Sequence, residues 1–327
     1  MKFGLLGYGF MGGAHLAALQ CIDGIAVTAV ATRTRPSTDS PARGNMDLPS
    51  GPLPESVKWV PEWQKVIQDA EIDAVDICLP TNLHKEAVLN ALENGKHVFC
   101  EKPMALTSTD CADLLEAAKK SNRVFMVGQV LRFMFPYRYA AAFVKEVGRE
   151  QLRGCTLQRS TGYPGWGGWL GKEERSGGAI LDLLSHDLDQ ALSLFGEPQT
   201  AKAISLGPVD TMQAILHYPD GLEVKVEGGW LEPDTPFSAN FRIEATGESL
   251  VYQDGTLSRE RGGTQVTIQI PATDNGYLSE LTYFVDCCRN NSAPDLCPPV
   301  ESALAVKISN LLKLSREQNG KEMQCRT

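Results

Sequence analysis

The sequence predicts a two-domain protein, in which an α/β domain with a doubly wound parallel sheet precedes an α+β domain with a large open, mainly antiparallel sheet. In the first part of the chain, apolar runs alternate with helical segments, which is the pattern of parallel strands joined by crossover helices. A glycine-rich turn joins the first apolar run to the first helix. From Leu157 onward the apolar segments are short and are separated by Asp-Gly turns, as in antiparallel sheets.

The first turn has the spacing Gly7-Tyr8-Gly9-Phe10-Met11-Gly12, between the apolar run Phe3 to Leu6 and the helical run Gly13 to Leu19. In such a turn the first glycine permits the bend, the second lets a pyrophosphate approach the backbone, and the third lets helix and strand pack closely. The free N–H groups of the helix then point at the phosphates. Because strand and helix both flank the turn, we predict a Rossmann dinucleotide-binding domain, with a structural βα turn as the alternative. The predicted cofactor contacts here are Gly7, Gly9, Phe10, Met11 and Gly12.

The second apolar run, Ala26 to Ala31, ends at Thr32-Arg33-Thr34-Arg35-Pro36. The adenosine ribose binds at this place in a Rossmann fold, where NAD sites usually carry an acidic residue and NADP sites an arginine. The chain has no acidic residue between Gly24 and Pro36. We therefore expect Thr32 and Arg33 to bind a 2′-phosphate and the protein to favour NADP over NAD. An exposed turn with solvated arginines is the alternative.

The remaining elements of the first domain follow a polar surface loop from Ser37 to Glu55. We expect strands at Val57 to Val60, Ala74 to Leu79, His97 to Cys100 and Val124 to Val127, and helices at Trp63 to Ala70, Thr81 to Asn94 and Thr107 to Ser121. Ligands of such sheets bind beyond the carboxyl ends of the strands. The residues expected to contact the cofactor at these ends are Leu79, Pro80, Thr81, Asn82, His84, Glu101 and Lys102. A purely structural role also accounts for His84.

The predicted boundary between the domains lies after residue 128, and residues 129–327 form the α+β domain, which we expect to bind the substrate. Its expected strands are Gln199 to Ser205, Thr211 to His217, Leu222 to Leu231, Phe237 to Ala245, Ser249 to Gln253 and Val266 to Ile270. Such a sheet has an apolar face to cover, with Trp230 and Phe241 among its side chains. We therefore expect a homo-oligomer, either a dimer or a tetramer, formed through the open sheet. The helical segment 301–318 is expected to pack back on the first domain.

One helix is expected among these strands, starting near Gly178. If it is continuous, Asp182 and His186 lie four residues apart on one face, and Asp189 lies one turn beyond. A carboxylate beside an imidazole orients the ring and makes it a better proton acceptor. A surface hydrogen bond between Asp182 and His186, with a structural pair for Asp189, explains the same spacing. The spacing does not decide between the two interpretations.

Composition argues against several classes of protein. Hydrophobic residues make up 43% of the 327 residues and charged residues 22%, as in ordinary globular proteins. No apolar run is long enough for a membrane span, and Phe3 already belongs to the first strand, so we expect no signal segment and a cytoplasmic protein. A net charge of −9 without a basic stripe argues against nucleic-acid binding. The nine cysteines show no metal-ligand spacing, so we expect reduced, mostly buried thiols and no metal.

Four motifs together resemble the glucose–fructose oxidoreductase, inositol dehydrogenase and MocA family over nearly the whole chain. They are Gly7-x-Gly9-x-x-Gly12, Thr81-Asn82-Leu83-His84, Glu101-Lys102-Pro103 and Gly177-Gly178-x-x-x-Asp182-x-x-x-His186. The resemblance implies a nicotinamide-dependent oxidoreductase acting on sugars, cyclic polyols or their keto forms. It also implies that Lys102 and His186 are the catalytic pair, that Asp182 positions them, and that Glu101 lies by the nicotinamide ribose. A cis peptide bond before Pro103 is a further expectation from the family.

These roles agree with the chemistry. When a hydride leaves a carbinol carbon, the hydroxyl proton must also leave, and His186 backed by a carboxylate is suited to accept it. The Lys102 cation would stabilise the alkoxide-like oxygen. A solvated lysine at the end of a strand is the alternative.

Substrate contacts are expected from the second domain as well. Tyr163, Trp166 and Trp169 are separated by glycines, and they either present aromatic faces to a sugar ring or pack in the core. The full expected set of substrate-binding residues is Lys102, Arg132, Tyr163, Trp166, Trp169, Asp182 and His186. A redox-neutral glycosidase of the same family, which oxidises, eliminates and reduces with one nucleotide, is the alternative function. A nucleotide-binding regulator without catalytic activity is a third.

Overall fold

The computed structural model describes residues 1–35, 44, 48, 53–165, 168–207 and 210–326. The chain forms two compact units, of which the first consists of Met1–Val130 with Asn275–Ala303 and the second of Leu131–Asp274 with Leu304–Thr327. Each unit is therefore built from two separate segments of the chain. Most of the predicted loop from Ser37 to Glu55, and Trp166 of the predicted substrate site, lie outside the described residues.

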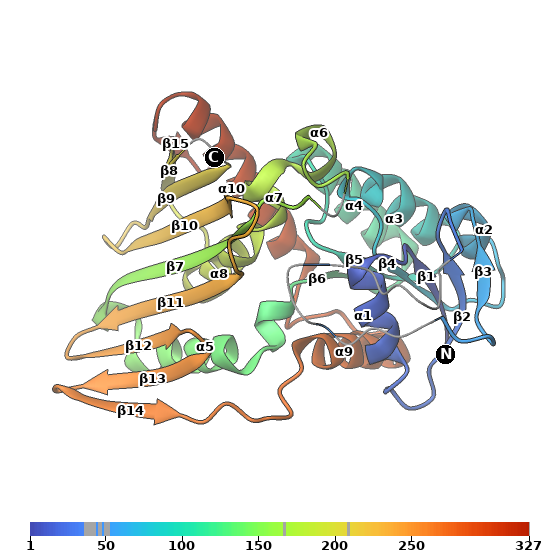
Figure 1. Ribbon diagram of the computed structural model, residues 1–327, viewed down its shortest axis with the longest axis horizontal. Helices are drawn as coiled ribbons and strands as arrows, with labels where there is room; N and C mark the ends of the chain where they lie inside the picture. Colours follow the sequence, from blue (N-terminus) through green and yellow to red (C-terminus); the bar gives the residue numbers. More distant parts are fainter. Residues whose placement is uncertain (36–43, 45–47, 49–52, 166–167, 208–209, 327) are drawn as a thin grey trace. The chain divides into compact units, whose positions relative to one another are not determined.

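The described residues of the first unit form a six-stranded sheet with the order β3-β2-β1-β4-β5-β6, in which all neighbours are parallel (Figure 1). Its strands are β1 Lys2–Leu6, β2 Ala26–Ala31, β3 Lys58–Val60, β4 Ala74–Ile77, β5 His97–Glu101 and β6 Phe125–Gly128. The strand order reverses between β1 and β4, and ligands of doubly wound sheets bind beyond the carboxyl ends of the strands at that point. The prediction of a doubly wound parallel sheet is confirmed.

The helices of the first unit surround this sheet. They are α1 Phe10–Leu19, α2 Trp63–Ile67, α3 His84–Glu93, α4 Ser108–Ser121 and α9 Gly276–Asn290, with a 3₁₀ turn η1 at Thr81–Leu83. Helix α2 is shorter than predicted, and the predicted helix from Thr81 begins as the 3₁₀ turn. Helix α4 starts after Thr107, whose hydroxyl accepts a hydrogen bond from the backbone N–H of Asp110 at 3.1 Å.

Helix α9 completes the first unit, although the sequence patterns did not predict it. The side chain of Asn275 caps the helix by accepting a hydrogen bond from the backbone N–H of Leu278 at 3.1 Å. Phe284 packs edge-on against Phe3 of β1 and Phe99 of β5, with ring centroids 6.2 and 5.5 Å apart. In the sequence, α9 comes after every strand of the second sheet except the short C-terminal strand β15. Its place in the first unit therefore depends on long-range packing, which sequence periodicity does not show.

The second unit contains a large sheet whose described strands follow the order β14-β13-β12-β11-β7-β10-β9-β8-β15. They are β7 Leu152–Gly162, β8 Thr200–Ser205, β9 Thr211–His217, β10 Glu223–Leu231, β11 Ser238–Ala245, β12 Glu248–Gln253, β13 Thr256–Arg261, β14 Thr264–Ile268 and β15 Met323–Gln324. Strands β7 and β10 are parallel, and the other neighbouring strands are antiparallel. The mainly antiparallel sheet is confirmed. Strand β13 was missed because its residues are mostly polar.

Helices cover one face of this second sheet (Figure 1). The elements are α5 Phe135–Val147, α6 Glu173–Ser176, α7 Gly178–Asp182, α8 Ser185–Phe195 and α10 Pro299–Glu317, with 3₁₀ turns η2 Val130–Phe133 and η3 Arg149–Gln151. Trp230 and Phe241, which the sequence placed on the apolar face that needs covering, are buried by helices of the same unit, with Trp230 packed against Ala179 of α7 and Phe241 against Tyr137 of α5. The unit boundary divides α10, so its first residues belong to the first unit.

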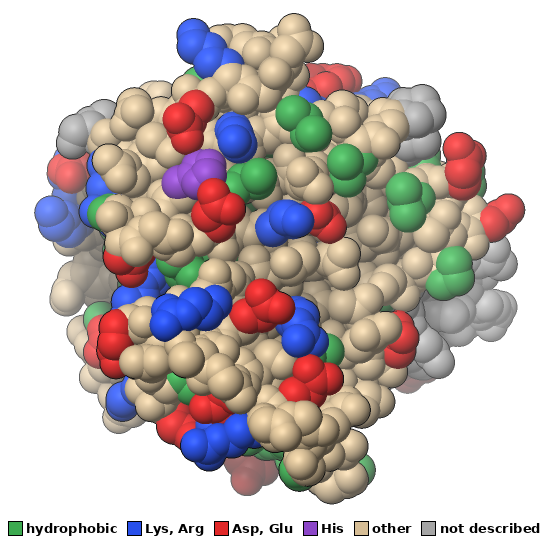
Figure 2. All heavy atoms as spheres, turned by 90° about the vertical axis from the view of Figure 1, so that its left-hand side faces the viewer, with side chains coloured by type: hydrophobic (Ala, Val, Ile, Leu, Met, Phe, Trp, Pro, Cys, Tyr) green, Lys and Arg blue, Asp and Glu red, His purple; other side chains and the backbone are tan. Residues whose placement is uncertain are grey.

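The surface drawn in Figure 2 carries Lys and Arg side chains next to Asp and Glu, and its hydrophobic side chains are scattered. This mixture differs from the continuous positive surface on which nucleic-acid binding depends. Among the described helices, none combines the length and the apolar character that crossing a bilayer requires. All nine cysteines are free thiols and seven are buried, which confirms the expectation for them.

Candidate functional site

The glycine-rich turn joins β1 to α1 with the close approaches that a dinucleotide site needs. Gly7 has a φ of +98°, and a Cβ there would overlap the carbonyl oxygen of Cys78. A Cβ on Gly12 would overlap the carbonyl oxygen of Gly7, whereas one on Gly9 would meet nothing within 4 Å. Gly9 is also the N-cap of α1 and has no side chain to cap the helix, so this residue leaves the first N–H groups of α1 uncapped. The turn therefore fits a bound pyrophosphate.

Thr32 and Arg33 lie at the same edge of the sheet. The backbone N–H of Gly7 donates to the carbonyl oxygen of Ala31 at 2.8 Å, which holds the glycine-rich turn beside the end of β2. The carbonyl oxygen of Thr32 accepts a hydrogen bond from the Trp59 indole at 2.9 Å, and the side chain of Arg33 is exposed. Contact of these two residues with a nucleotide stays a prediction.

The segment after β4 carries the next group of predicted cofactor contacts, which are Leu79, Pro80, Thr81, Asn82 and His84. His84 is buried, and its Nε2 lies 2.8 Å from the carbonyl oxygen of Leu79 while its Nδ1 lies 2.9 Å from that of Pro103. Burial lowers the pKa of the His84 imidazole, although both carbonyl groups act in the opposite direction. His84 thus links the end of β4 to the segment after β5, as the structural interpretation of this residue requires.

Glu101, Lys102 and Pro103 form the turn at the end of β5. The Lys102–Pro103 peptide is cis, which confirms the expectation from the family. Glu101 is buried, and its Oε2 accepts a hydrogen bond from the backbone N–H of Lys102 at 3.2 Å. Hydrogen bonds from Glu101 and His84 therefore hold this turn on both sides of Lys102.

His15 of α1 contacts the same turn. Its Nδ1 lies 2.9 Å from Asp76 Oδ2 and 3.3 Å from Cys78 Sγ, and its Nε2 lies 3.0 Å from Glu101 Oε1. Burial by itself would lower the pKa of His15, but Asp76 and Cys78 raise it well above its usual range. Burial would raise the pKa of Glu101, but the contact with His15 lowers it. The one sequence feature that pointed to His15 was its position, three residues after Gly12 at the end of the glycine-rich turn.

Glu280 of α9 brings a third carboxyl group to this cluster. It is fully buried, and neither carboxyl oxygen has a hydrogen-bond partner among the described residues. Burial, followed by repulsion from Glu101, raises the pKa of Glu280 well above its usual range. Donor atoms of His15, Glu101 and Glu280 lie within 4.8 Å of one another. Because both nitrogens of His15 face carboxylates at hydrogen-bonding distance, we interpret the cluster as an ion-pair network and assign no metal to it.

In the second unit, the prediction of one continuous helix from Gly178 through His186 is wrong. Helix α7 ends at Asp182, and α8 begins as a separate helix. Between them the backbone N–H of Leu184 donates to the carbonyl oxygen of Ala179, five residues earlier, at 2.9 Å. This wider turn breaks the four-residue helical repeat. Asp182 therefore ends one helix and His186 lies in the first turn of the next.

Two buried ion pairs, formed by Asp187 and Asp189, hold α8 directly after His186. Asp187 pairs with Arg159 of β7 through hydrogen bonds of 2.7 and 3.2 Å, and Asp189 pairs with Arg132 of η2 through bonds of 2.8 and 2.7 Å. The four side chains are between 1% and 6% exposed. The structural interpretation of Asp189 is confirmed. Arg132 is engaged by that pair, and its contact with a substrate stays a prediction.

The aromatic loop after β7 is described in part. Tyr163 is 37% exposed, donates from its hydroxyl to the carbonyl oxygen of Gly171 at 3.2 Å, and packs edge-on against Trp230. Trp169 is partly buried. Two of the three predicted aromatic residues therefore keep accessible surface on one short loop, and their contact with a sugar stays a prediction.

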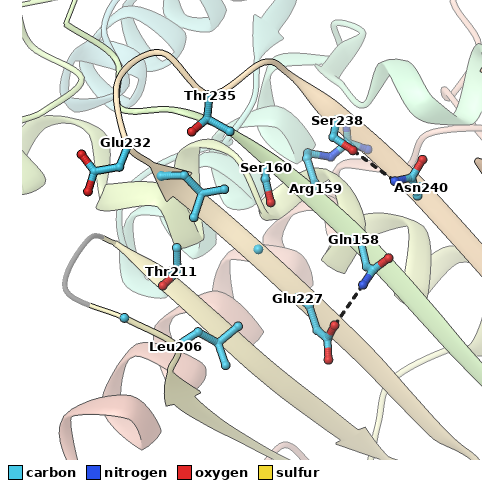
Figure 3. Close-up of a pocket in the computed structure, with 13 residues that line it drawn as sticks. Gln158, Arg159, Ser160, Leu206, Thr211, Glu227, Glu232, Thr235, Ser238 and Asn240 are labelled. Carbon is cyan, nitrogen blue, oxygen red and sulfur yellow. Dashed lines mark hydrogen bonds between the residues drawn. The ribbon is translucent and has the colours of Figure 1, made fainter. Parts of the chain in front are cut away.

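A hollow of about 640 Å³ lies over strands β7, β10 and β11 of the second sheet (Figure 3). In its lining, Gln158 of β7 donates to Glu227 of the neighbouring strand β10 at 3.1 Å, and Leu206 is one of its apolar side chains. The described lining contains none of the residues predicted for catalysis or cofactor binding. We therefore do not assign the hollow to the substrate.

The predicted site residues belong to different units. Lys102 lies in the first unit with the cofactor-binding turns, and Asp182 and His186 lie in the second. Lys102 and the cofactor-binding turns lie along one edge of the first sheet. That Lys102 forms one active site with Asp182 and His186 stays a prediction.

Comparison with known proteins identifies both parts of the chain. A model described as an oxidoreductase family with an NAD-binding Rossmann fold matches residues 1–129, and one described as the GFO/IDH/MocA C-terminal domain matches residues 139–251. The chain belongs to the Gfo/Idh/MocA family. The resemblance inferred from four motifs is thereby confirmed.

Named relatives resemble the chain to different extents. The 2,7-anhydro-N-acetylneuraminate hydratase of Escherichia coli is 34% identical over 175 residues, which cover 48% of this chain and 46% of the relative. The myo-inositol 2-dehydrogenase of Thermotoga maritima is 25% identical over 348 residues, covering 98% and 97%. The chain thus spans about half the length of the hydratase. A structure of levoglucosan dehydrogenase in complex with NADH and levoglucosan matches with a TM-score of 0.81 at 20% identity, covering 100% of both chains, and shows the same fold.

Proposed function

We propose that this member of the family is an NAD(P)-dependent oxidoreductase that transfers a hydride between the nicotinamide and a carbinol or carbonyl carbon of a sugar, cyclic polyol or keto-sugar. The observation that carries the proposal is the Glu101-Lys102-Pro103 turn, which side-chain hydrogen bonds hold at the carboxyl edge of a Rossmann sheet. The relatives named for inositol and for anhydrosugars support this class of substrate.

The residues of the chain would handle the proton. A bound nicotinamide dinucleotide supplies the hydride acceptor or donor. We assign to His186 the uptake of the hydroxyl proton and to Asp182 the positioning of the catalytic groups. The ammonium group of Lys102 stabilises negative charge that develops on the reacting oxygen. In the reductive direction the same groups return the proton to the carbonyl oxygen.

For the cofactor, we propose a preference for NADP over NAD. The exposed Arg33 follows β2 next to the glycine-rich turn, and the sequence from Gly24 to Pro36 has no acidic residue. A guanidinium group binds a 2′-phosphate with charge-assisted hydrogen bonds, whereas a ribose 2′-hydroxyl is usually bound by a carboxylate.

A redox-neutral reaction is the second candidate, because one relative is named a hydratase. Such an enzyme would oxidise the sugar, eliminate or add a group beside the new carbonyl, and then reduce the sugar with the same nucleotide. Lys102 and His186 would serve both redox steps. The two candidates differ in whether reduced nucleotide accumulates.

The test is turnover with NADP and NAD, in both directions, over aldoses, inositols, keto-sugars, anhydrosugars and glycosides, with Lys102→Ala as the comparison. Nicotinamide absorbance that changes with the wild type and not with the variant supports the dehydrogenase. Conversion of a glycoside or anhydrosugar without a net absorbance change supports the redox-neutral candidate. Equal turnover by both proteins contradicts the role of Lys102.

We also propose that the open face of the second sheet forms a homo-oligomer. Exposed apolar side chains at Ile204 of β8 and at Leu206 directly after it support this proposal. Light scattering should give the mass of a dimer or a tetramer, and the mass of a single chain at micromolar concentration would contradict it.

A further inference from the structure

The turn that carries Lys102 is connected to a buried ion pair in the core of the first unit. We propose that His15 is a positioning residue for Lys102, and that it acts through the carboxylate of Glu101. This inference rests on the proposed function, because it supposes that Lys102 acts on the substrate.

The connection consists of three successive contacts. Asp76 Oδ2 lies 2.9 Å from His15 Nδ1, and His15 Nε2 lies 3.0 Å from Glu101 Oε1. The other oxygen of Glu101 then accepts the backbone N–H of Lys102 at 3.2 Å. His15 and Asp76 are fully buried and Glu101 is 7% exposed, so water competes little for these three contacts.

Charge makes the connection specific to a histidine. A protonated imidazole donates from both nitrogens, and here both face carboxylates. A neutral imidazole has one donor and one acceptor nitrogen, and an acceptor nitrogen facing a carboxylate is repelled by it. The raised pKa of His15, to which Asp76 contributes against the effect of burial, agrees with the protonated form.

The position of Glu101 matters because its two oxygens serve different purposes. Oε1 is held by His15, and this fixes Oε2, which in turn fixes the peptide between Glu101 and Lys102. Displacement of a catalytic group by about 1 Å can lower turnover by about 10²-fold, even when the substitution lies away from the reacting atoms. His84 holds the other side of the turn through Pro103, so loss of His15 would leave the turn anchored on one side.

A role in packing alone is the competing explanation, since the His15 ring lies edge-on to Phe99 at 5.5 Å. Two amide substitutions separate the explanations. Asparagine places its NH₂ group near the position of Nδ1 and can still donate to Asp76, whereas glutamine places it near Nε2 and can still donate to Glu101. Both remove the ring, so a packing role predicts similar losses for the two variants.

The experiment compares kcat, KM and the Kd of the reduced nucleotide for His15→Asn and His15→Gln. We expect His15→Asn to lower kcat by about 10²-fold and His15→Gln by about 10-fold, with a nucleotide Kd within about 2-fold of the wild type. In a Lys102→Ala background, His15→Asn should cause little further loss, because the two residues act on one step. Equal losses in the two variants, or full additivity with Lys102→Ala, would overturn the proposal.

Hydrogen exchange gives a readout that does not depend on activity. The backbone N–H of Lys102 should exchange faster in His15→Asn than in His15→Gln or the wild type, and equal protection in all three proteins would contradict the proposal. If neither variant folds, the same measurements are made on Asp76→Asn, because this substitution keeps the shape of the side chain and removes the charge that favours protonated His15.

Wild-type turnover by Lys102→Ala would refute the proposed function, whereas an inactive Lys102→Ala beside a fully active His15→Asn would refute only this inference.

Discussion

In the first unit, the expected functional residues lie in short turns that directly follow strands, whereas in the second unit His186 lies on a helix that side chains distant in sequence hold in place. The glycine-rich turn and the turn at Lys102 have their conformation fixed by neighbours at the same sheet edge. Helix α8 is held by Arg159 of β7 and Arg132 of η2. Sequence spacing is therefore a better guide to the first kind of site than to the second.

We expect the largest effect on turnover when one predicted catalytic residue is removed from each unit. Lys102→Ala and His186→Ala should each lower kcat by about 10³-fold, because proton transfer and charge stabilisation both depend on them. Nucleotide affinity should change little for His186→Ala, as titration of nicotinamide fluorescence would measure. His217→Ala is the control for a histidine of the second unit outside the site. Loss of nucleotide binding in His186→Ala would show that the residue is structural.

The ion pairs that hold α8 give the next largest effect. Arg159→Ala leaves the buried carboxylate of Asp187 without its partner, so the free energy of unfolding should fall by about 3–5 kcal/mol. Arg242, which pairs with Glu244 on the surface and is 46% exposed, is the matched control, and its substitution by alanine should cost less than about 1 kcal/mol. Urea unfolding measures both values. Similar losses in the two variants would show that the buried pair holds α8 no more strongly than an exposed pair stabilises the surface of the sheet.

The nucleotide-binding edge of the first unit is tested by Arg33→Ala. This variant should raise the Kd for NADP by about 10-fold, because a charge-assisted hydrogen bond to the 2′-phosphate is lost. The Kd for NAD, which lacks that phosphate, is the internal control and should change by less than about 2-fold. Isothermal titration with each nucleotide decides the matter, and equal weakening of both would refute the assignment of this turn.

The smallest expected effect concerns Glu280 in the core of the first unit. Its pKa in the folded protein is raised above the ordinary value of 4.5, so folding takes up a proton between the two pKa values and the wild type loses stability as pH rises through that interval. Glu280→Gln carries no such cost. The Tm of the variant minus that of the wild type should therefore increase with pH above about 4.5, with a slope equivalent to at most about 1.4 kcal/mol per pH unit. A difference independent of pH would show that Glu280 is not shifted.

Much of the fold could be predicted from local pattern, and the missing parts have physical reasons. The six parallel strands and the glycine-rich turn followed from apolar runs and from the positions of Gly7, Gly9 and Gly12. Strand β13 was not predicted, because its polar residues are held in the sheet by cross-strand pairing more than by hydrophobic burial. Helix α9 was not predicted, because the residues it packs against, Phe3 and Phe99, are remote from it in the sequence.

The candidate site shows the same limit. The residues of the Lys102 turn were evident from their motif. The break between α7 and α8 was not evident, because it depends on how the chain packs there. His15 and Glu280 were missed as members of the cluster because a buried polar network is defined by distances in space. A carboxyl group in the middle of an otherwise apolar helix face, as at Glu280, is the signal that the sequence did offer.

Direct transfer of a hydride between sugar and nucleotide is the central claim, and isotope transfer tests it most directly. A substrate found by the turnover panel would be supplied with deuterium at its reacting carbon, and the nucleotide would be recovered for mass spectrometry. We predict that the reduced nucleotide gains one deuterium with the wild type, and that Lys102→Ala yields almost none in the same time. Conversion of the substrate by the wild type with no deuterium in the nucleotide would contradict the account.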